Sequence, residues 1–440
     1  MTEKSRRYLL ALWEGGGNIP PELGVARRLI ARGHQVHVLG DPTIKVAAEA
    51  GGCSFSPWRR GPHRNSLDPS EDPLKDWETK NPLVMLRRAR DRFIAGPAAE
   101  FAADTADTID AFAPDAVVAD AFLFGSIIAA QGSALPVALL VPNIWMLPSR
   151  GTPPIGPGFA PAKTVLGRSR DAAMVALVNR LFRAGLPPVN SARSEYGLAP
   201  LSSFYEQALG VERILVLSSP AFDYAASSVP ANVHYVGPIL DDPEWAQPWI
   251  SPWADADERP LVLVGFSSTY QNQGPLLRRV IAALSTLPVR AVVTVGQMLE
   301  PDEVTSTDNV VVVGTAPHRE ILARASLAVS HCGHGTTMKT LAAGVPMVCT
   351  RWAATRTTPR LGWCTTEPGS GCRAALRHPE SAGRCSGRSA TTASAPMRRG
   401  WLRPSPTRVR PLTSSPNLSR WCRRGGQSRS DPSGGRGRRE

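Results

Sequence analysis

The residues best suited to chemistry in this sequence form a glycine-rich turn, HCGHGTT, at positions 331–337. The apolar run LAVS precedes the turn, and the helical pattern MKTLAAG follows it. Gly333 and Gly335 let a ligand approach the backbone closely, and the helix start offers unpaired N–H groups. The side chains that add hydrogen-bond donors are His331, Thr336 and Thr337. The pattern favours a phosphate site, with an ordinary strand–helix turn as the alternative.

Alternating apolar runs and helical patterns predict the elements that position this turn. RYLLALW at 7–13 is typical of a buried parallel strand, and glycines at 15–17, a helical pattern at 20–34 and the strand QVHVLG follow it. Further strands are expected at DAVVAD, LPVALLVP and RILVLSS. Together these elements predict a doubly wound α/β, Rossmann-like domain over residues 1–240.

A second series of the same kind begins after a segment with linker composition, 241–259. It runs through PLVLVGFSST, GPLLRRVIAALSTL, RAVVTVG, NVVVVG, HREILARA and SLAVS, alternating strands with helices. We expect a partial second Rossmann-like domain over 260–350. Two such domains would enclose a ligand cleft between the carboxyl ends of their sheets.

The full string SHCGHGTT…LAAGVP resembles the donor-binding motif of the GT-B glycosyltransferases of family 1. This UDP-glycosyltransferase-like group includes bacterial enzymes that decorate macrolides and other natural products. ARRLIARGHQVHVLG, HYVGPIL and VGFSST also stand in that family's order, so the resemblance covers about residues 7–349. It implies a GT-B fold and an inverting transfer of a hexose from a nucleotide sugar to a hydroxyl of an apolar small molecule.

The resemblance also implies the donor site. The diphosphate would be held by His331, Gly333, Gly335, Thr336 and Thr337; the nucleotide base would be bordered by Pro317 and His318; and the phosphate side of the cleft would be lined by Gly265, Ser267 and Ser268. At Lys339 many relatives carry Glu, which contacts ribose hydroxyls. Lys cannot accept those hydrogen bonds, so both a UDP-linked and a dTDP-linked donor remain open.

No cofactor is expected, because the nucleotide sugar is a substrate and His331 with the helix N-terminus would neutralise its phosphates. The acid pair in DAD at 255–257 resembles a metal-binding motif, but it lies in the predicted linker. We therefore expect no metal site.

The catalytic base departs from the family pattern. Inverting transfer needs a group that takes the proton of the acceptor hydroxyl, and in this family a His in the first glycine loop does so, oriented by an Asp. Here Gly17 stands at the position of that His. Our first candidate base is Asp120 in VVADAF, acting directly or through water, with Glu14 and Asn18 as weaker candidates. An acidic acceptor that needs little help and a purely structural Asp120 are the alternatives.

The acceptor is expected to lie in the first domain. Its border would include Asn18 and the loop NIWMLPSRGTPPIG, in which Trp145 could form a wall. Surface irregularity is the other interpretation of this loop.

Charge separates the last 90 residues from the rest. Residues 351–440 hold 19 of the chain's 50 basic residues, all Arg, and four of its 37 acidic ones. The first 350 residues therefore carry 31 basic and 33 acidic groups, which is ordinary for a globular protein. A segment rich in Arg, Pro, Ser, Gly and Thr cannot bury a core, so we expect a non-native, disordered tail. A nucleic-acid-binding extension is the alternative, and its binding would be non-specific and sensitive to salt.

A shift of reading frame explains this change. When the third base of each codon is read with the next two, Trp352 followed by Ala353 must give Gly. With permitted codons, 350–360 then yields Pro-Met-Gly-Arg-Asp-Gln-Asn-Asp-Thr-Ala, which resembles the family and includes the Asp-Gln pair that contacts donor sugar hydroxyls. We infer a frameshift near Cys349 and Thr350 and expect impaired activity. A non-catalytic nucleotide-sugar-binding protein or pseudogene product is the alternative function.

Cysteine usage and hydropathy indicate location. Cys53, Cys332 and Cys349 lack metal-ligand or CxxC spacing, so we expect reduced thiols. No apolar run reaches membrane-spanning length, and the short YLLALW run fits a strand better than a signal peptide. We expect a cytoplasmic protein.

Overall fold

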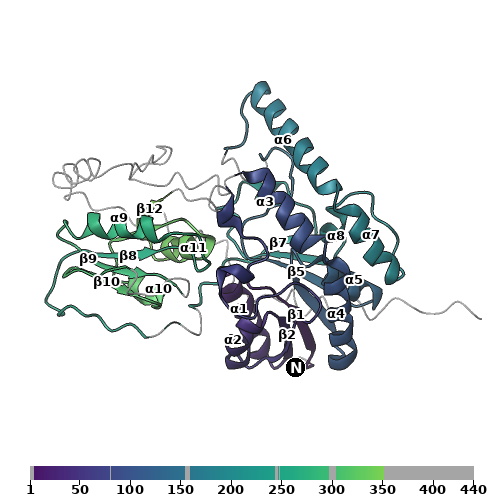
Figure 1. Ribbon diagram of the computed structural model, residues 1–440, viewed down its shortest axis with the longest axis horizontal. Helices are drawn as coiled ribbons and strands as arrows, with labels where there is room; N and C mark the ends of the chain where they lie inside the picture. The colour runs from purple at the N-terminus through teal and green to yellow at the C-terminus, as the bar shows by residue number, and fades with distance from the viewer. Residues whose placement is uncertain are drawn as a thin grey trace, which may run out of the picture.

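The computed structural model describes residues 4–79, 81–153, 159–242, 246, 248–296 and 304–350. The expectations for 351–440, namely the disordered tail and the effects of the frameshift, lie outside these residues. The described chain forms two α/β domains that lie side by side (Figure 1). This is the two-domain arrangement that the sequence predicts.

The first domain is built on a seven-stranded, fully parallel sheet of order β3-β2-β1-β4-β5-β6-β7. Its strands are β1 (Arg7–Ala11), β2 (Gln35–Gly40), β3 (Ser54–Pro57), β4 (Ala116–Asp120), β5 (Val137–Val141), β6 (Arg213–Val216) and β7 (Val233–Tyr235). Its α-helices are α1 (Ile19–Ile30), α2 (Lys45–Ala50), α3 (Pro82–Ala89), α4 (Ala98–Phe112), α5 (Phe124–Gly132), α6 (Val165–Arg183), α7 (Leu186–Glu195) and α8 (Glu206–Leu209). Its shorter helical turns are η1 (Pro42–Ile44), η2 (Pro69–Glu71), η3 (Asp76–Glu78), the π-helical η4 (Arg90–Ile94) and η5 (Tyr224–Ser227).

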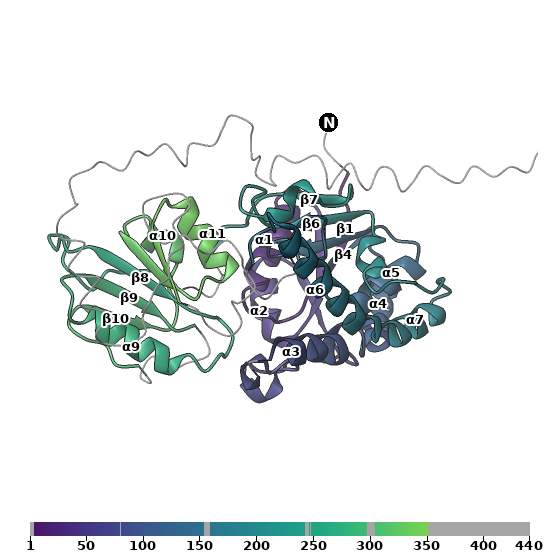
Figure 2. The same cartoon turned by 90° about the horizontal axis from the view of Figure 1, so that it is seen from above.

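The second domain has a parallel sheet of order β10-β9-β8-β11-β12 among the described residues. Its strands are β8 (Leu261–Gly265), β9 (Arg290–Thr294), β10 (Val310–Val313), β11 (Leu327–Ser330) and β12 (Met347–Cys349). Its helices are α9 (Gly274–Leu284), α10 (His318–Leu322) and α11 (His334–Ala342). Both views show α11 on the side of this domain that faces the first domain (Figures 1 and 2).

Side-chain alternation builds a core on each face of the first sheet. In β1, Leu9 and Ala11 join the cluster that contains residues of α4 and α5, whereas Tyr8 and Leu10 join the cluster formed with α1 and α2. Burial of each large apolar side chain contributes roughly 1.5–3 kcal/mol. The two-sided burial explains why the strand reads as a continuous apolar run.

The order of each sheet reverses at one point, and the reversal places the functional loops. In the first domain it lies between β1 and β4, so the glycine loop at 15–17 and Asp120 emerge at the same edge. In the second domain it lies between β8 and β11, which brings the loop at 266–269 beside the turn at 331–335. Open α/β sheets bind ligands at such reversals.

Within the predicted linker 241–259, Trp249 and Trp253 pack against the core of the second sheet. One sequence-based expectation needs correction. The expectation of three reduced thiols is wrong for two of them, because Cys332 and Cys349 form a disulfide, while Cys53 is buried and unpaired. Their 17-residue separation hid this pairing, since parallel strands β11 and β12 bring the two residues into adjacent positions.

Within the described residues, no helix is both long and apolar enough to span a bilayer.

Candidate active site

A cleft of about 390 Å³ separates the carboxyl edges of the two sheets. The first domain contributes Trp13, Gly15, Gly17, Asn18, Asp120, Phe122, Asn143 and Met146 among other residues, and the second domain contributes Phe266, Ser267, Ser268, Thr269, Thr294, Gly296, His318, Lys339 and the turn 331–336. Most sequence-predicted donor residues therefore lie opposite the first glycine loop and Asp120. Gly265, Pro317 and Thr337 lie beneath the lining instead.

The turn at 331–337, which the sequence predicts to bind the donor, contains buried polar groups without a partner among the described residues. Gly333 lines the cleft and is the N-cap of α11, so the first N–H groups of that helix, which lack intrahelical partners, lie at the cleft edge. Within the described part of the chain, the buried Nδ1 of His331 and the buried Oγ1 of Thr337 have no hydrogen-bond partner. Burial lowers the pKa of His331 to about 4. The imidazole is therefore neutral at pH 7, and it also interacts with the backbone of Gly265.

His318, at the start of α10, lines another part of the cleft wall in the second domain. Its Nε2 lies 2.9 Å from the hydroxyl of Thr294 at the end of β9, and burial lowers its pKa to about 4. Gly265 is required here, since a Cβ at that position would lie 2.9 Å from the His318 ring. Pro317 caps α10 and sets the position of His318 without lining the cleft itself.

Gly17, the position at which the sequence resemblance implies a histidine, is open. Gly17 is exposed and borders the cleft, and a Cβ added there would meet no atom within 4 Å. Beside it, Asn18 Nδ2 donates to the Trp13 carbonyl at 2.9 Å and to Glu22 Oε2 at 3.2 Å. Asp120 is 2% exposed, and its Oδ1 accepts from the Phe122 N–H at 2.8 Å. Burial raises the pKa of Asp120.

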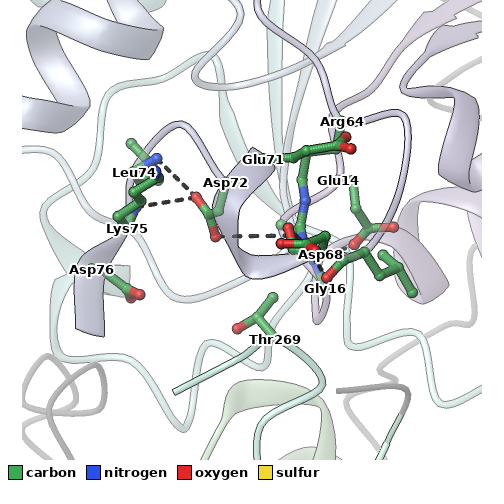
Figure 3. Close-up of polar contacts among 12 residues, drawn as sticks. Glu14, Gly16, Arg64, Asp68, Glu71, Asp72, Leu74, Lys75, Asp76 and Thr269 are labelled. Carbon is green, nitrogen blue, oxygen red and sulfur yellow. Dashed lines mark hydrogen bonds and ion pairs between the residues drawn. The ribbon is translucent and has the colours of Figure 1, made fainter. Parts of the chain in front are cut away.

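Glu14, a weaker candidate base, points away from the cleft. Its Oε1 accepts from the Gly16 N–H at 2.6 Å, and it lies beside Arg64 and Asp72 in the contact network of Figure 3. Burial raises its pKa to about 7. Glu14 therefore shapes the glycine loop instead of lining the cleft.

The two domains touch closely around the cleft. Gly16 has a φ of 76° and lies against the 268–269 loop, where a Cβ would approach Thr269 Cγ2 to 2.5 Å. Figure 3 places Thr269 facing this loop. On the other side, Lys339 Nζ pairs with Asp242 Oδ1 at 2.6 Å. The ammonium thus lies at the cleft wall but is already neutralised by a carboxylate.

The expected acceptor wall at Trp145 is corrected by the structure. Trp145 is 4% exposed and belongs to the first domain's core; its N–H groups bond Asp223 through the backbone and Ser149 through the ring. Its neighbours Asn143 and Met146 line the cleft. They follow β5 at the same sheet edge, a position that sequence could have indicated.

Asp257, the second acid of DAD, lies in an ion-pair network. Asp257 bonds Arg259 at 2.6 Å and lies 3.9 Å from Arg290. No cluster of three or more His, Cys, Asp or Glu side chains in the described ranges could hold a metal ion.

Solved structures share this architecture. The glycotransferase of kitacinnamycin superposes with a TM-score of 0.63 at 20% identity, covering 88% of this chain and 94% of the other. The chain has the GT-B fold. The glycosyltransferase VinC, solved with dTDP, superposes with a TM-score of 0.52 at 17% identity over 78% of this chain and 80% of its own.

Curated relatives are natural-product glycosyltransferases. The 4'-demethylrebeccamycin synthase of Lentzea aerocolonigenes is 29% identical over 350 residues, which are 78% of this chain and 82% of the relative. The demethyllactenocin mycarosyltransferase of Streptomyces fradiae is 26% identical over 76% of this chain and 68% of the relative. No protein-family model matches the chain. The resemblance seen in the sequence is thus confirmed at the level of fold and relatives.

One functional neighbour escaped the sequence-based analysis. Glu22 stands in the first turn of α1, where acidic residues favourably face the helix dipole and usually remain in solvent. Here it is 0% exposed and contacts Asn18 and Asp120. Because only the packing of α1 against the end of β4 buries it, no local pattern could reveal it.

Proposed function

We propose that this chain transfers a hexose, with inversion, from a nucleotide sugar to a hydroxyl of an apolar small molecule. The observation that carries the proposal is the cleft itself. The glycine turn before α11 and the carboxyl of Asp120 border it from opposite domains. The relatives' names support sugar transfer in natural-product pathways.

The donor diphosphate would lie at the N-terminus of α11. The unpartnered His331 Nδ1 and Thr337 hydroxyl are buried groups that a phosphate could satisfy, and unmet buried polar groups are costly. Ser267 and Ser268 border the same part of the cleft. His318 would lie near the nucleotide base.

Lys339 bears on how strongly the site selects the nucleoside of the donor. An ammonium held by Asp242 cannot accept hydrogen bonds from ribose hydroxyls. We therefore propose weak discrimination between UDP-linked and dTDP-linked donors. The dTDP bound to VinC is consistent with the second class.

Asp120 is the proposed base. It borders the cleft beside the vacant volume at Gly17, and burial raises its proton affinity. The acceptor would lie against Asn18, Asn143 and Met146. We further propose that the chain works in the cytoplasm and that its activity is impaired, because the Asp-Gln pair implied by the family is absent from the sequence after Cys349.

The test uses the full chain with UDP-glucose and dTDP-glucose and a panel of phenols and macrolactones. Mass spectrometry detects a product that has gained one hexose, and its anomeric configuration establishes inversion. D120N should lower the rate by about 10²–10⁴ if Asp120 is the base. E49Q, an exposed change on α2, is the matched control.

Calorimetry with UDP and dTDP separates the alternatives. Donor binding without transfer or hydrolysis would favour a non-catalytic nucleotide-sugar-binding protein. Absence of both binding and transfer would refute the proposal.

A further inference from the structure

Glu22 and Asp120 form a buried carboxyl pair at the cleft wall. Glu22 is 0% exposed and Asp120 is 2% exposed, and the two carboxyl groups are neighbours that act on each other's pKa. They come from different elements, α1 and the end of β4, which meet at the sheet's order reversal. Asp120 borders the cleft, and Glu22 lies behind it.

The hydrogen bonds that Glu22 and Asp120 accept do not supply every carboxyl oxygen with a donor, so one proton can be shared between the two carboxyls. Glu22 Oε2 accepts from Asn18 Nδ2, and Asp120 Oδ1 accepts from the Phe122 N–H. Among the described residues, no donor reaches the buried Oε1 of Glu22. Two ionised carboxylates cannot bond each other, because both are acceptors only. A proton on one of them satisfies both groups.

The surrounding charges favour the same state. The other titratable group acting on Glu22 is Glu14, in the loop after β1, and it is acidic as well. Burial raises the pKa of both Glu22 and Asp120, and the negative charges of Asp120 and Glu14 raise that of Glu22 further. Neighbouring buried carboxyls titrate together and hold one proton between them near neutral pH.

We propose that Glu22 is the positioning residue of the transfer reaction and holds a shared proton that keeps Asp120 oriented toward the cleft as a monoanionic base. This proposal rests on the proposed function. It replaces the missing histidine of the first glycine loop with a carboxyl pair built from residues already present. Shared-proton carboxyl pairs are known to act as general bases.

The step balances with the pair alone. The proton of the acceptor hydroxyl moves to the pair through Asp120, and the acceptor oxygen bonds the anomeric carbon. The bond from that carbon to the diphosphate breaks, and its electron pair leaves with the diphosphate. Glu22 retains its own proton, so both carboxyls end the step neutral.

Infrared difference spectroscopy tests the pair in the full chain without requiring activity. A neutral carboxyl gives a carbonyl band distinct from that of a carboxylate. At pH 7 we expect one such band that is lost in both E22Q and D120N and unchanged in E49Q. E14Q should remove a different band, because Glu14 lies in the loop after β1 and is not a member of the pair. A spectrum in which E22Q and D120N leave every neutral-carboxyl band in place would overturn the proposal.

The pH dependence of kcat/KM tests the role of the Glu22–Asp120 pair in the reaction. In the wild type the pair should give two ionisations, whereas E22Q should leave only one because Gln donates permanently to Asp120. E22Q should lower kcat less than tenfold, and D120N should lower it about 10²–10⁴-fold. Identical pH profiles for the wild type and E22Q would contradict the assignment. A wild type that transfers no sugar would refute the proposed function, and the infrared result would still decide whether the pair exists.

Discussion

His334 Nε2 lies 3.0 Å from the Ser218 hydroxyl, so the first residue of α11 in the second domain bonds the end of β6 in the first. Ser218 is fully buried, and burial lowers the pKa of His334 to about 4. The bond is therefore uncharged at pH 7. It joins α11 of the second domain directly to the first domain across the cleft.

Ser218→Ala should weaken the contact between the domains. The change leaves a little-exposed imidazole nitrogen without its partner, at a cost of about 1–3 kcal/mol. We expect a lower unfolding temperature and weaker binding of UDP, measured by thermal unfolding and calorimetry. Ser219→Ala is the control, because the Ser219 hydroxyl accepts from the Ala221 N–H within its own loop. Equal effects of the two changes would argue against a contribution of the His334–Ser218 bond.

Adjacent glycines of the first loop should respond oppositely to substitution. Gly16→Ala places a methyl group 2.5 Å from Thr269 in a left-handed conformation, so it should separate the domains and reduce donor affinity at least tenfold. Gly17→Ala meets open space and should have little effect. Calorimetry with UDP measures both, and equal losses would show that the loop is not in contact with the second domain.

Gly17→His should supply the base that the sequence resemblance implies. A Cβ at this position meets no atom within 4 Å, Asp120 lines the same cleft, and general-base catalysis contributes about 10²–10⁴-fold. We expect at least a tenfold gain in sugar transfer over both the wild type and Gly17→Ala, measured by product formation. No gain in a folded variant would indicate that proton removal does not limit the reaction.

Acid should destabilise the protein through His331. Its folded pKa of about 4 lies below the ordinary 6.5, so the unfolded chain binds a proton that the folded chain refuses. The stability is fully present above pH 6.5 and is lost as the pH falls from 6.5 toward 4. Glu14 and Asp41, whose pKa values are raised to about 7 and 6, act with the opposite sign.

Comparison with His331→Gln isolates that contribution. Between pH 7 and 5 the wild type should lose about 1–2 kcal/mol more unfolding free energy than the variant. Binding of a diphosphate should raise the pKa of His331 and draw a proton from the buffer. Calorimetry in buffers of different ionisation enthalpy detects this uptake, and its persistence in His331→Gln would assign it elsewhere.

The Cys332–Cys349 disulfide should stabilise the donor turn. It closes a loop over a sequence separation of 17, which corresponds to about 3 kcal/mol in the chain-entropy model. Cys349→Ser should lower the unfolding temperature and donor affinity, whereas Cys53→Ser removes an unpaired thiol and should leave donor affinity unchanged. Peptide mapping under non-reducing conditions checks the bond. Detection of both cysteines as thiols would contradict it.

Local sequence determined most of the architecture. Continuous apolar strands, the helix pattern after Gly17 and the turn at 331–337 each depend on neighbouring residues, and the structure confirms the two parallel sheets that they predict. His331 and Thr336, which the same short string predicts to bind the donor, line the cleft.

Only the tertiary structure decided which residues meet. The order reversal of the first sheet buries Glu22 against Asp120, and the parallel pairing of β11 with β12 joins Cys332 to Cys349. The same packing turns Trp145 into the core and leaves Met146 at the cleft. Contacts between residues far apart in the chain depend on strand order and on interdomain packing, whereas local patterns report only whether a segment is apolar, periodic or able to turn.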